Sequence, residues 1–542
     1  MFGVKRSVTP PASVADSLVL SLAVGLAAVL LRLVRIQHLG ISHWDEGAYV
    51  RGGLEFLRDF WPGFAYQAPE HAPPLFPLFL CLSFRGLGTH DFAAFVVPAL
   101  LGGATVGVVF WILDRWVGRG AAWAGALVLA CCQLHLAYSR IALTDAPFTF
   151  FYTLGLAVAL ARIPRSDGDW VGRGRLWSTG LVLGLVTTLA MYTKYHGPII
   201  WLSATCFEWF LIVAQCLAIR WRWVARIVGR WPAMPVHGWH RVGSLLLAAG
   251  LAWAAWTPWR DYAAQTYGPA AMHAQHLEFI LPPDALIEVI PDRLLIIAVV
   301  LWVWARWAAV LAIVGLAAAL RRASPWSWIV MGWGAAYGAA LLLYEPFIRL
   351  MVPLTPLLAL LAGPGLVRLA RAAAGTRHQM VGRVVAVAVV IAIVFEAAVA
   401  LGWRSDGYRR LSEAMAQGLP EFAANPAARV VRRLAHPIVF YDPKWPHGDM
   451  LEADQPLDLY GRHCYVLVDY SVDWMPESRD LFAKWLRWRR LARMLPNPRL
   501  PPTLYNPPRR GDLGVMLGRR SPDPGLTHFR LFEVKIGDDA NQ

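Results

Sequence analysis

The sequence predicts an all-α polytopic membrane protein that is followed by a C-terminal soluble α/β domain. Of the 542 residues, 57% are hydrophobic, and the mean hydropathy is +0.43, which is too apolar for an ordinary soluble enzyme. Apolar runs long enough to cross a bilayer recur along the first part of the chain. From Arg404 onward the hydropathy falls and prolines become frequent. We therefore expect a membrane domain over residues 1–403 and a soluble domain over residues 404–542.

The apolar runs predict about eleven transmembrane helices of roughly 17 to 25 residues each. Arginine clusters lie on alternate sides of these runs, which places the clusters and the N-terminus in the cytoplasm. The C-terminal domain then lies outside the cytoplasm. The runs are near residues 16–36, 91–113, 121–138, 146–161, 177–193, 198–219, 243–258, 304–320, 327–344, 351–367 and 384–402.

Two further apolar segments are expected to lie along the membrane surface rather than across it. Residues 73–80 are short and rich in proline, and a span there would invert every later loop. We therefore assign residues 45–88 to one outer loop that carries two interfacial helices. Residues 285–303 form another interfacial helix that breaks near residues 304–307, because a continuous helix would put Arg306 in the middle of the membrane.

The C-terminal domain is predicted from alternating apolar residues. Strands are expected at residues 437–441, 464–469 and 528–534, and a basic amphipathic helix at residues 478–494. Cys464 is the only cysteine in this domain, which excludes a disulfide within it.

Two adjacent acids, Asp45 and Glu46, directly follow the first apolar run. Ionised groups beside a low-dielectric boundary have shifted pKa values and mark candidate functional sites. We expect Asp45 to act as a general base because its acidic neighbour would raise its pKa. The alternative is a solvated interfacial pair that caps a helix.

Three cations in the predicted outer loops are exceptions to the positive-inside rule, by which cations concentrate in the cytoplasmic loops. They are Arg140, Lys194 and Arg349, each beside aromatic or acidic residues. Lys194 is the only lysine between Lys5 and Lys444, which indicates a need for a compact ammonium group. The alternative for each is a residue whose charged end reaches the membrane interface.

The order of these motifs resembles the GT-C glycosyltransferases. They look most like the bacterial dolichyl-phosphate-mannose protein mannosyltransferase type, to which the lipid A aminoarabinose transferases are related. The resemblance covers roughly residues 17–370 and rests on Asp45-Glu46, His71-Ala72-Pro73-Pro74-Leu75, Ser139-Arg140 to Asp145, Lys194-Tyr195-His196-Gly197, and Arg349 to Pro356. Two departures are Leu350, where the family commonly has Tyr, and a C-terminal region that matches no member.

The resemblance implies transfer of a sugar from a polyprenyl-phosphate carrier to an envelope glycolipid, polysaccharide or protein, usually with inversion. This reaction would take place on the outer face of the inner membrane. The matching positions imply that Asp45 is the catalytic acid-base group, Glu46 its partner, and Asp145 a second acid that positions donor or acceptor. The positions expected near the lipid phosphate and donor are Arg140, Lys194, Arg349, His71 and Tyr49.

No feature of the sequence demands a cofactor, although Asp45 and Asp145 would suit Mg²⁺ or Mn²⁺. The expected partners are the lipid bilayer, the polyprenyl-phosphate-linked sugar and the envelope acceptor. Nucleic acid is not expected, because the basic residues lie in short loops between apolar runs.

Two other function classes remain open from the residues alone. A transporter or flippase would bind a proton or substrate at acids near the bilayer midplane, and only Glu208 and Glu396 lie that deep in the predicted spans. A non-catalytic scaffold would use its outer domain to bind an envelope partner.

Overall fold

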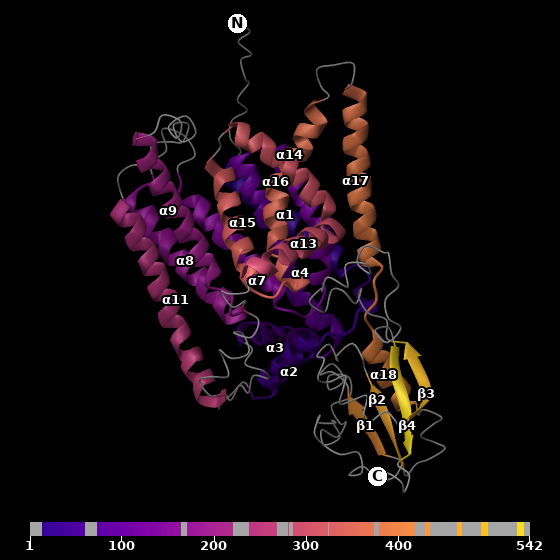
Figure 1. Ribbon diagram of the computed structural model, residues 1–542. Helices are drawn as coiled ribbons and strands as arrows, with labels where there is room; N and C mark the ends of the chain where they lie inside the picture. The colour runs from indigo at the N-terminus through magenta and orange to yellow at the C-terminus, as the bar shows by residue number, and fades with distance from the viewer. Residues whose placement is uncertain are drawn as a thin grey trace.

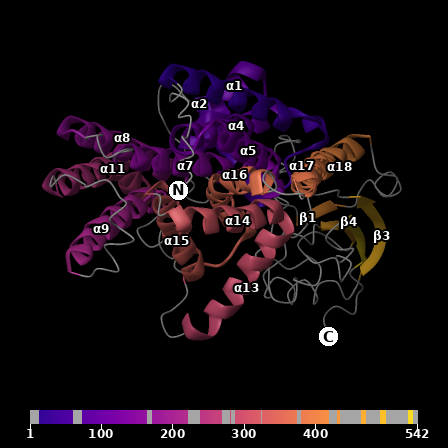
Figure 2. The same cartoon turned by 90° about the horizontal axis from the view of Figure 1, so that it is seen from above.

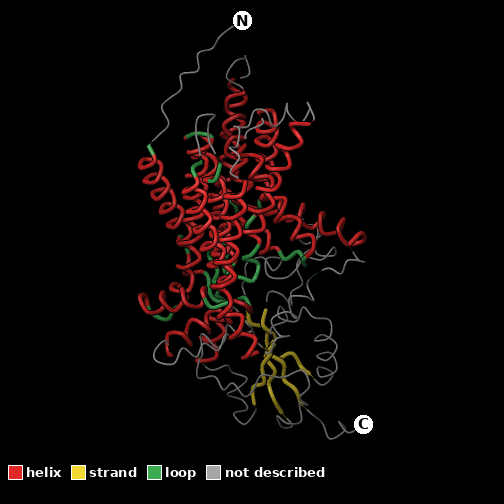
Figure 3. Tube along the Cα trace, turned by 90° about the vertical axis from the view of Figure 1, so that its left-hand side faces the viewer, coloured by secondary structure: helices red, strands yellow, loops and turns green. Residues whose placement is uncertain are grey.

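The computed structural model describes a helix bundle with a small β-sheet beyond one end (Figure 1). Figure 3, turned from that view, shows the strands gathered at the same end of the molecule. The described residues are 13–59, 73–163, 171–220, 238–267, 280, 286–322, 325–372, 379–417, 429–433, 463–468, 489–496 and 528–535.

The helices follow the apolar runs of the sequence. They are α1 (Val14–Leu33), α2 (Trp44–Asp59), α3 (Leu75–Leu87), α4 (Asp91–Trp116), α5 (Arg119–Cys131), α6 (Gln133–Tyr138), α7 (Asp145–Ala161), α8 (Arg173–Thr193), α9 (Ile199–Arg220), α11 (Gly238–Tyr267), α13 (Leu286–Trp304), α14 (Arg306–Arg322), α15 (Pro325–Leu343), α16 (Leu354–Ala372), α17 (Gln379–Leu401) and α18 (Gly407–Ala416). Two short 3₁₀ helices, η1 (Ile36–His38) and η4 (Ile348–Met351), lie in the loops.

Every one of the predicted apolar runs coincides with helix, but not every run is a full span. Among the described residues, seven helices are long and apolar enough to cross a membrane, or eight if α13 and α14 count as one bent span. By this criterion the described residues hold fewer spans than the expected eleven. Helices α5 and α7 are shorter apolar helices, α9 enters this count only through Ile199–Phe210, and α14 meets the criterion only together with α13.

The predicted break between residues 285–303 and the next span is confirmed. The axes of α13 and α14 meet at 107°, and Arg306 lies at the first position of α14. The segment between α1 and α4 also contains the two expected helices, α2 and α3, which lie across the lower end of the bundle (Figure 1).

Small residues bring the membrane helices close together. A Cβ atom at Gly103 of α4 would overlap with Val29 Cγ2 of α1. A Cβ atom at Gly315 of α14 would overlap with the carbonyl oxygen of Leu361 in α16. Lipid tails are as apolar as leucine, so helices in a bilayer associate through such close packing rather than through the hydrophobic effect.

The C-terminal sheet has four strands in the order β1-β2-β4-β3. Strand β1 (Arg429–Arg433) runs parallel to β2 (His463–Val468), while β4 (His528–Lys535) runs antiparallel to both β2 and β3 (Arg489–Pro496). The strands predicted at residues 464–469 and 528–534 are confirmed as β2 and β4.

The amphipathic helix predicted at residues 478–494 is wrong where the structure describes it, because residues 489–494 belong to β3. These residues include good helix formers, but pairing with β4 overrides that intrinsic preference. The remainder of that prediction, and the strand predicted at residues 437–441, lie outside the described residues.

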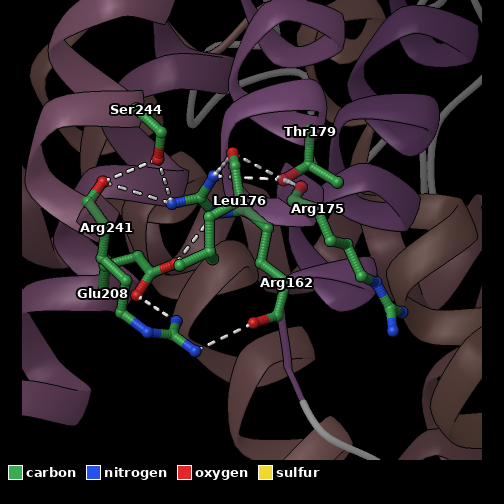
Figure 4. A network of polar contacts seen from close by, with 7 residues as sticks. All are labelled: Arg162, Arg175, Leu176, Thr179, Glu208, Arg241 and Ser244. Atoms are coloured by element: carbon green, nitrogen blue, oxygen red, sulfur yellow. Dashed lines mark hydrogen bonds and ion pairs between the residues drawn. The ribbon is translucent and has the colours of Figure 1, made fainter. Parts of the chain in front are cut away.

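A buried ion-pair network holds α7, α8, α9 and α11 together (Figure 4), on the side of the bundle where α8, α9 and α11 gather (Figure 2). Arg162, which caps the C-terminus of α7, donates from Nε to Glu208 Oε1 of α9 over 2.9 Å. Arg241 of α11 donates to Glu208 Oε2 over 2.8 Å and to the carbonyl of Arg162 over 3.0 Å. Ser244 accepts another Arg162 hydrogen bond. Both oxygens of Glu208 are thus occupied by arginines.

We expect Arg162→Ala to destabilise the protein by about 3 kcal/mol, because removing one partner leaves the other groups of a buried ion pair unsatisfied. The measurement is thermal unfolding of the purified protein in detergent. The matched control is Arg175→Ala, since Arg175 lies in the same region but its side chain points away from the network (Figure 4). Equal unfolding midpoints for the two variants would show that the network does not stabilise the fold.

Candidate active site

Four elements bring two carboxylates and two cations together. Asp45 lies in the first turn of α2, Asp145 begins α7, Lys194 follows the last residue of α8, and Arg349 lies in η4. Lys194 Nζ donates to Asp145 Oδ1 over 2.5 Å, and Arg349 donates to Asp45 Oδ2. Two residues 304 positions apart therefore form one ion pair.

The charges around Asp45 keep it ionised. Burial raises the pKa of Asp45, but the positive charge of Arg349, with smaller contributions from His43 and Lys194, lowers the pKa to about 2. The expectation that an acidic neighbour would raise this pKa is therefore wrong. Adjacent residues on a helix point in different directions, so Glu46 does not face Asp45.

Both cations are coupled to both acids. Burial lowers the pKa of Lys194, and the charges of Asp145 and Asp45 partly offset that effect. Burial also disfavours charge on Arg349, but Asp45 and then Asp145 outweigh it, so the pKa of Arg349 lies above its usual value. The four groups form one electrostatic unit.

Glu46 is fully buried, with 0% of its surface exposed, and caps α2 instead of joining this unit. Its Oε2 accepts from the backbone N–H groups of Ser42 and His43 over 2.9 and 2.8 Å, as expected for an acid at the third position of a helix. Its Oε1 accepts from the N–H of Ala142 over 2.8 Å. Burial raises the pKa of Glu46 to about 7 against these hydrogen bonds. The carboxylate therefore links the Asp45 loop to the loop before Asp145.

Arg140 lies apart from the four-residue cluster. It is only 2% exposed, and its guanidinium donates to the backbone carbonyls of Arg32, Val34 and Ala400 over 3.0, 2.7 and 3.2 Å. These carbonyls lie at the C-terminal ends of α1 and α17, where a cation offsets the helix dipole. The structure thus places Arg140 as a shared helix cap and does not bring it to the position expected for a phosphate ligand.

Tyr49 lies one helical turn after Asp45 and on the same face of α2. Its ring meets the edge of Phe76 with centroids 5.4 Å apart. Burial and then the charge of Asp45 raise its pKa, and its hydroxyl hydrogen-bonds to Thr144. Tyr49 thus stays neutral and lines the cluster, whereas His71 lies outside the described residues.

Two aromatic residues of the site were missed by the sequence analysis. Burial raises the pKa of Tyr344 to about 12, and its other electrostatic partners include Arg349 and Asp45. The ring of His196 meets that of Tyr344 edge-on at 5.1 Å. Their positions were a usable signal, because Tyr344 lies five residues before Arg349 and His196 belongs to the Lys194 motif.

The described residues do not fit a divalent ion between Asp45 and Asp145. Each carboxylate already binds a cation. Among the described residues, no three His, Cys, Asp or Glu side chains lie together in a way that could hold a metal ion. Asp145 Oδ2 is buried and has no hydrogen-bond partner within the described structure. It remains available to accept a hydrogen bond from a substrate.

The two deep acids on which a transporter would depend are both paired. Glu208 binds Arg162 and Arg241, as described above. Glu396 accepts from Arg306 Nε and, over 3.1 Å, from Trp307 Nε1. Neither carboxylate is positioned as an open proton site at the middle of the bundle.

Comparisons with known proteins concern the family and the fold. Residues 71–239 match the family described as dolichyl-phosphate-mannose-protein mannosyltransferase. No curated protein matches the sequence. Among solved structures, ArnT from Cupriavidus metallidurans bound to undecaprenyl phosphate is similar with a TM-score of 0.56 and 16% identity, over 89% of this chain and 97% of that chain.

The oligosaccharyltransferase of Archaeoglobus fulgidus in its apo form is similar with a TM-score of 0.51 and 13% identity, over 84% of this chain and 70% of that chain. The archaeal AglB from the same organism, in complex with an inhibitory peptide and a dolichol-phosphate, gives a TM-score of 0.50 and 13% identity, over 78% and 63% of the two chains. The family match over residues 71–239 and the shared fold confirm the resemblance of this multi-pass membrane protein to the GT-C glycosyltransferases.

Proposed function

We propose that this protein transfers a sugar from a polyprenyl-phosphate carrier to an acceptor of the cell envelope. The acceptor is a glycolipid, a polysaccharide or a protein, and transfer takes place on the outer face of the inner membrane. One observation carries the proposal: Asp45, Asp145, Lys194 and Arg349 meet at one end of a GT-C-like bundle. The similar ArnT and AglB structures, which hold undecaprenyl phosphate and dolichol-phosphate, support the choice of carrier.

In this reaction Asp45 is the general base. It takes the proton of the acceptor as the acceptor oxygen or nitrogen attacks the anomeric carbon of the sugar. The bond from that carbon to the phosphate oxygen breaks, and its electron pair leaves with the polyprenyl phosphate. A single displacement inverts the anomeric carbon. Retention would need a carboxylate nucleophile with an acid within about 5.5 Å.

Arg349 couples donor binding to the strength of the base. Without donor, the guanidinium is bound to Asp45 and holds its pKa at about 2, where the carboxylate is a weak base. An anionic phosphodiester competes for that guanidinium through charge-assisted hydrogen bonds. As Arg349 turns to the phosphate, the pKa of Asp45 rises and the carboxylate becomes the better proton acceptor. The base is thereby activated only when the donor is in place.

Lys194 and Asp145 complete the site. The charges of Asp45 and Arg349 act on the pKa of Lys194, so Lys194 lies near both residues. Its ammonium therefore stabilises the same leaving phosphate. Asp145 holds that ammonium in place through Oδ1. Its Oδ2, which has no partner among the described residues, accepts a hydrogen bond from a hydroxyl of the sugar or acceptor. Tyr49 contributes a neutral hydroxyl beside Asp45.

Glu46 makes the proposed reaction dependent on pH. Protonation converts an acceptor oxygen of Glu46 into a donor and weakens its bonds to Ser42, His43 and Ala142. Because the pKa of Glu46 is raised to about 7, we expect kcat/KM to fall as the pH decreases through 7, since kcat/KM reports groups of the free enzyme. Asp45 does not account for this decrease, because its pKa in the free enzyme is about 2.

The pH profile of kcat/KM checks this expectation. Glu46→Gln introduces a donor at every pH, so its rate should be low and should show no decrease near pH 7. His43→Asn is the matched control, since its amide oxygen replaces the acceptor that His43 Nδ1 offers to the Asp45 N–H. If the decrease near pH 7 persists in Glu46→Gln, another group causes it.

Mass spectrometry of envelope glycolipids, polysaccharides and glycoproteins, with and without the gene, tests the function itself. We expect one sugar to disappear from one acceptor while its polyprenyl-phosphate form accumulates. An unmodified set of envelope glycans would refute the proposal. Transport of a finished glycolipid would instead leave the modification intact but on the wrong side of the membrane.

A further inference from the structure

The segment after α17 folds back onto the loop that leads to Asp45. Ser405 donates from its backbone N–H to the carbonyl of His38 over 3.2 Å. Its hydroxyl donates to the carbonyl of Gly40 over 3.0 Å and accepts from the N–H of Gly40 over 3.2 Å. Ser405 is fully buried in this contact.

Arg409, four residues after Ser405 and in the first turn of α18, binds the same loop. Its Nη2 donates to the carbonyl of Gln37 over 2.9 Å, and its Nη1 approaches the carbonyl of Leu39 at 3.5 Å. The same Nη1 donates to Asp91 Oδ2 over 2.8 Å, at the start of α4. The four consecutive carbonyls of residues 37–40 therefore all contact Ser405 or Arg409.

This arrangement compensates for the irregular backbone of the loop. Arg35 adopts a left-handed conformation with φ of 54°, η1 is only three residues long, and α2 does not begin until Trp44. Carbonyls that no helix or sheet pairs need other donors, above all where they are buried, as at Gly40. Ser405 and Arg409 supply them, so the path of the chain towards Asp45 depends on residues that follow the last membrane helix.

We propose that Ser405 and Arg409 are positioning residues for Asp45, and that residues 404–409 belong to the catalytic unit. The boundary of the soluble domain then lies after α18 and not at residue 403. The consequence for catalysis rests on the proposed function, whereas the consequence for the loop does not.

A displaced base lowers the chemical rate more than it lowers donor binding. Misplacement by about 1 Å can reduce a rate 10²-fold. The groups expected to bind the donor phosphate, Lys194 and Arg349, come from other elements and are not contacted by Arg409. We therefore expect Arg409→Ala to lower kcat about tenfold to 10²-fold, and to leave the KM for the donor within about twofold.

The matched control is Arg410→Ala. Both arginines lie on α18 at the protein surface, with 30% and 46% of their side chains exposed, and both bind Asp406. Only Arg409 reaches the loop and Asp91. Ser405→Ala is a second variant, which removes a single hydroxyl that makes two of the loop contacts.

Two measurements on the full-length protein separate the two claims. Hydrogen exchange of peptides covering residues 36–46 reports the loop directly, through the N–H groups of Gly40, Ser42 and His43. Transfer kinetics with a polyprenyl-phosphate sugar report catalysis. We expect faster exchange and lower kcat in Arg409→Ala and Ser405→Ala, with wild-type values of both in Arg410→Ala.

Equal exchange in Arg409→Ala, Ser405→Ala and Arg410→Ala would overturn the proposal. Faster exchange with unchanged kcat would also overturn it, because the contact would then be structural only. If the wild type shows no transfer from any polyprenyl-phosphate sugar, the proposed function fails, and the exchange measurement alone still decides whether these residues hold the loop.

Discussion

Replacing Asp45 with Asn is expected to lower kcat about 10³-fold, within the range of 10² to 10⁴ that a general base contributes. Asparagine has the shape of aspartate and its oxygen still accepts a hydrogen bond from Arg349, so the fold and the site should be retained. The amide cannot take a proton from the acceptor. Initial-rate kinetics of the purified variant in proteoliposomes measure this effect.

The control for this experiment is Asp261→Asn, which changes an exposed carboxylate on α11 that pairs only with its neighbour Arg260 within the described structure. Its kcat should equal that of the wild type. A near wild-type rate for Asp45→Asn would assign the base to another group. Asp145 would be the first candidate, because its Oδ2 has no hydrogen-bond partner among the described residues.

The second large effect is expected for Arg349→Ala. This change removes a charged donor from the phosphate that leaves, and such donors contribute about 10² to 10³ in kcat. It also removes the main cause of the low pKa of Asp45. Burial then dominates and raises the pKa of Asp45 above its usual value, so the carboxylate becomes protonated as the pH falls through the normal range.

Arg349→Ala should therefore have a low maximal rate and an additional loss of activity at acidic pH. The pH profile of kcat/KM measures this second effect, since it reports groups of the free enzyme. Arg349→Lys retains the charge but not the planar fork, and should recover the acidic activity more fully than the maximal rate. Arg51→Ala, which removes an exposed arginine of α2, serves as the control. An unchanged pH profile in Arg349→Ala would show that Arg349 does not set the pKa of Asp45.

The sequence identified most of the candidate site because the cost of charge at a membrane leaves a local signal. Asp45 and Asp145 stand out as acids beside apolar runs, and Lys194 and Arg349 as cations on the side that topology disfavours. Their pairing could not be predicted. The partners Arg349 and Asp45 are 304 positions apart, and only the packing of the helices decides which acid meets which cation.

Other residues carried the same local signal but serve the fold. Arg140 looks like Lys194 in sequence, yet it binds helix carbonyls that come together only in the tertiary structure. Glu46 was assigned as the partner of Asp45 because the two are adjacent. Its position three residues after His43 also fits a capping interaction. At residues 489–494 a strand partner outweighed helix propensity, which no local pattern reports.

The central claim is tested most directly by following the donor and its sugar separately. Purified protein in proteoliposomes is given a polyprenyl-phosphate sugar with distinct labels on the lipid and the sugar, together with an extract of envelope acceptors. We predict that one free polyprenyl phosphate appears for each sugar attached to an acceptor, and that Asp45→Asn forms neither product. Labelled donor that crosses the membrane with its sugar still attached, at the same rate in wild type and Asp45→Asn, would contradict the account.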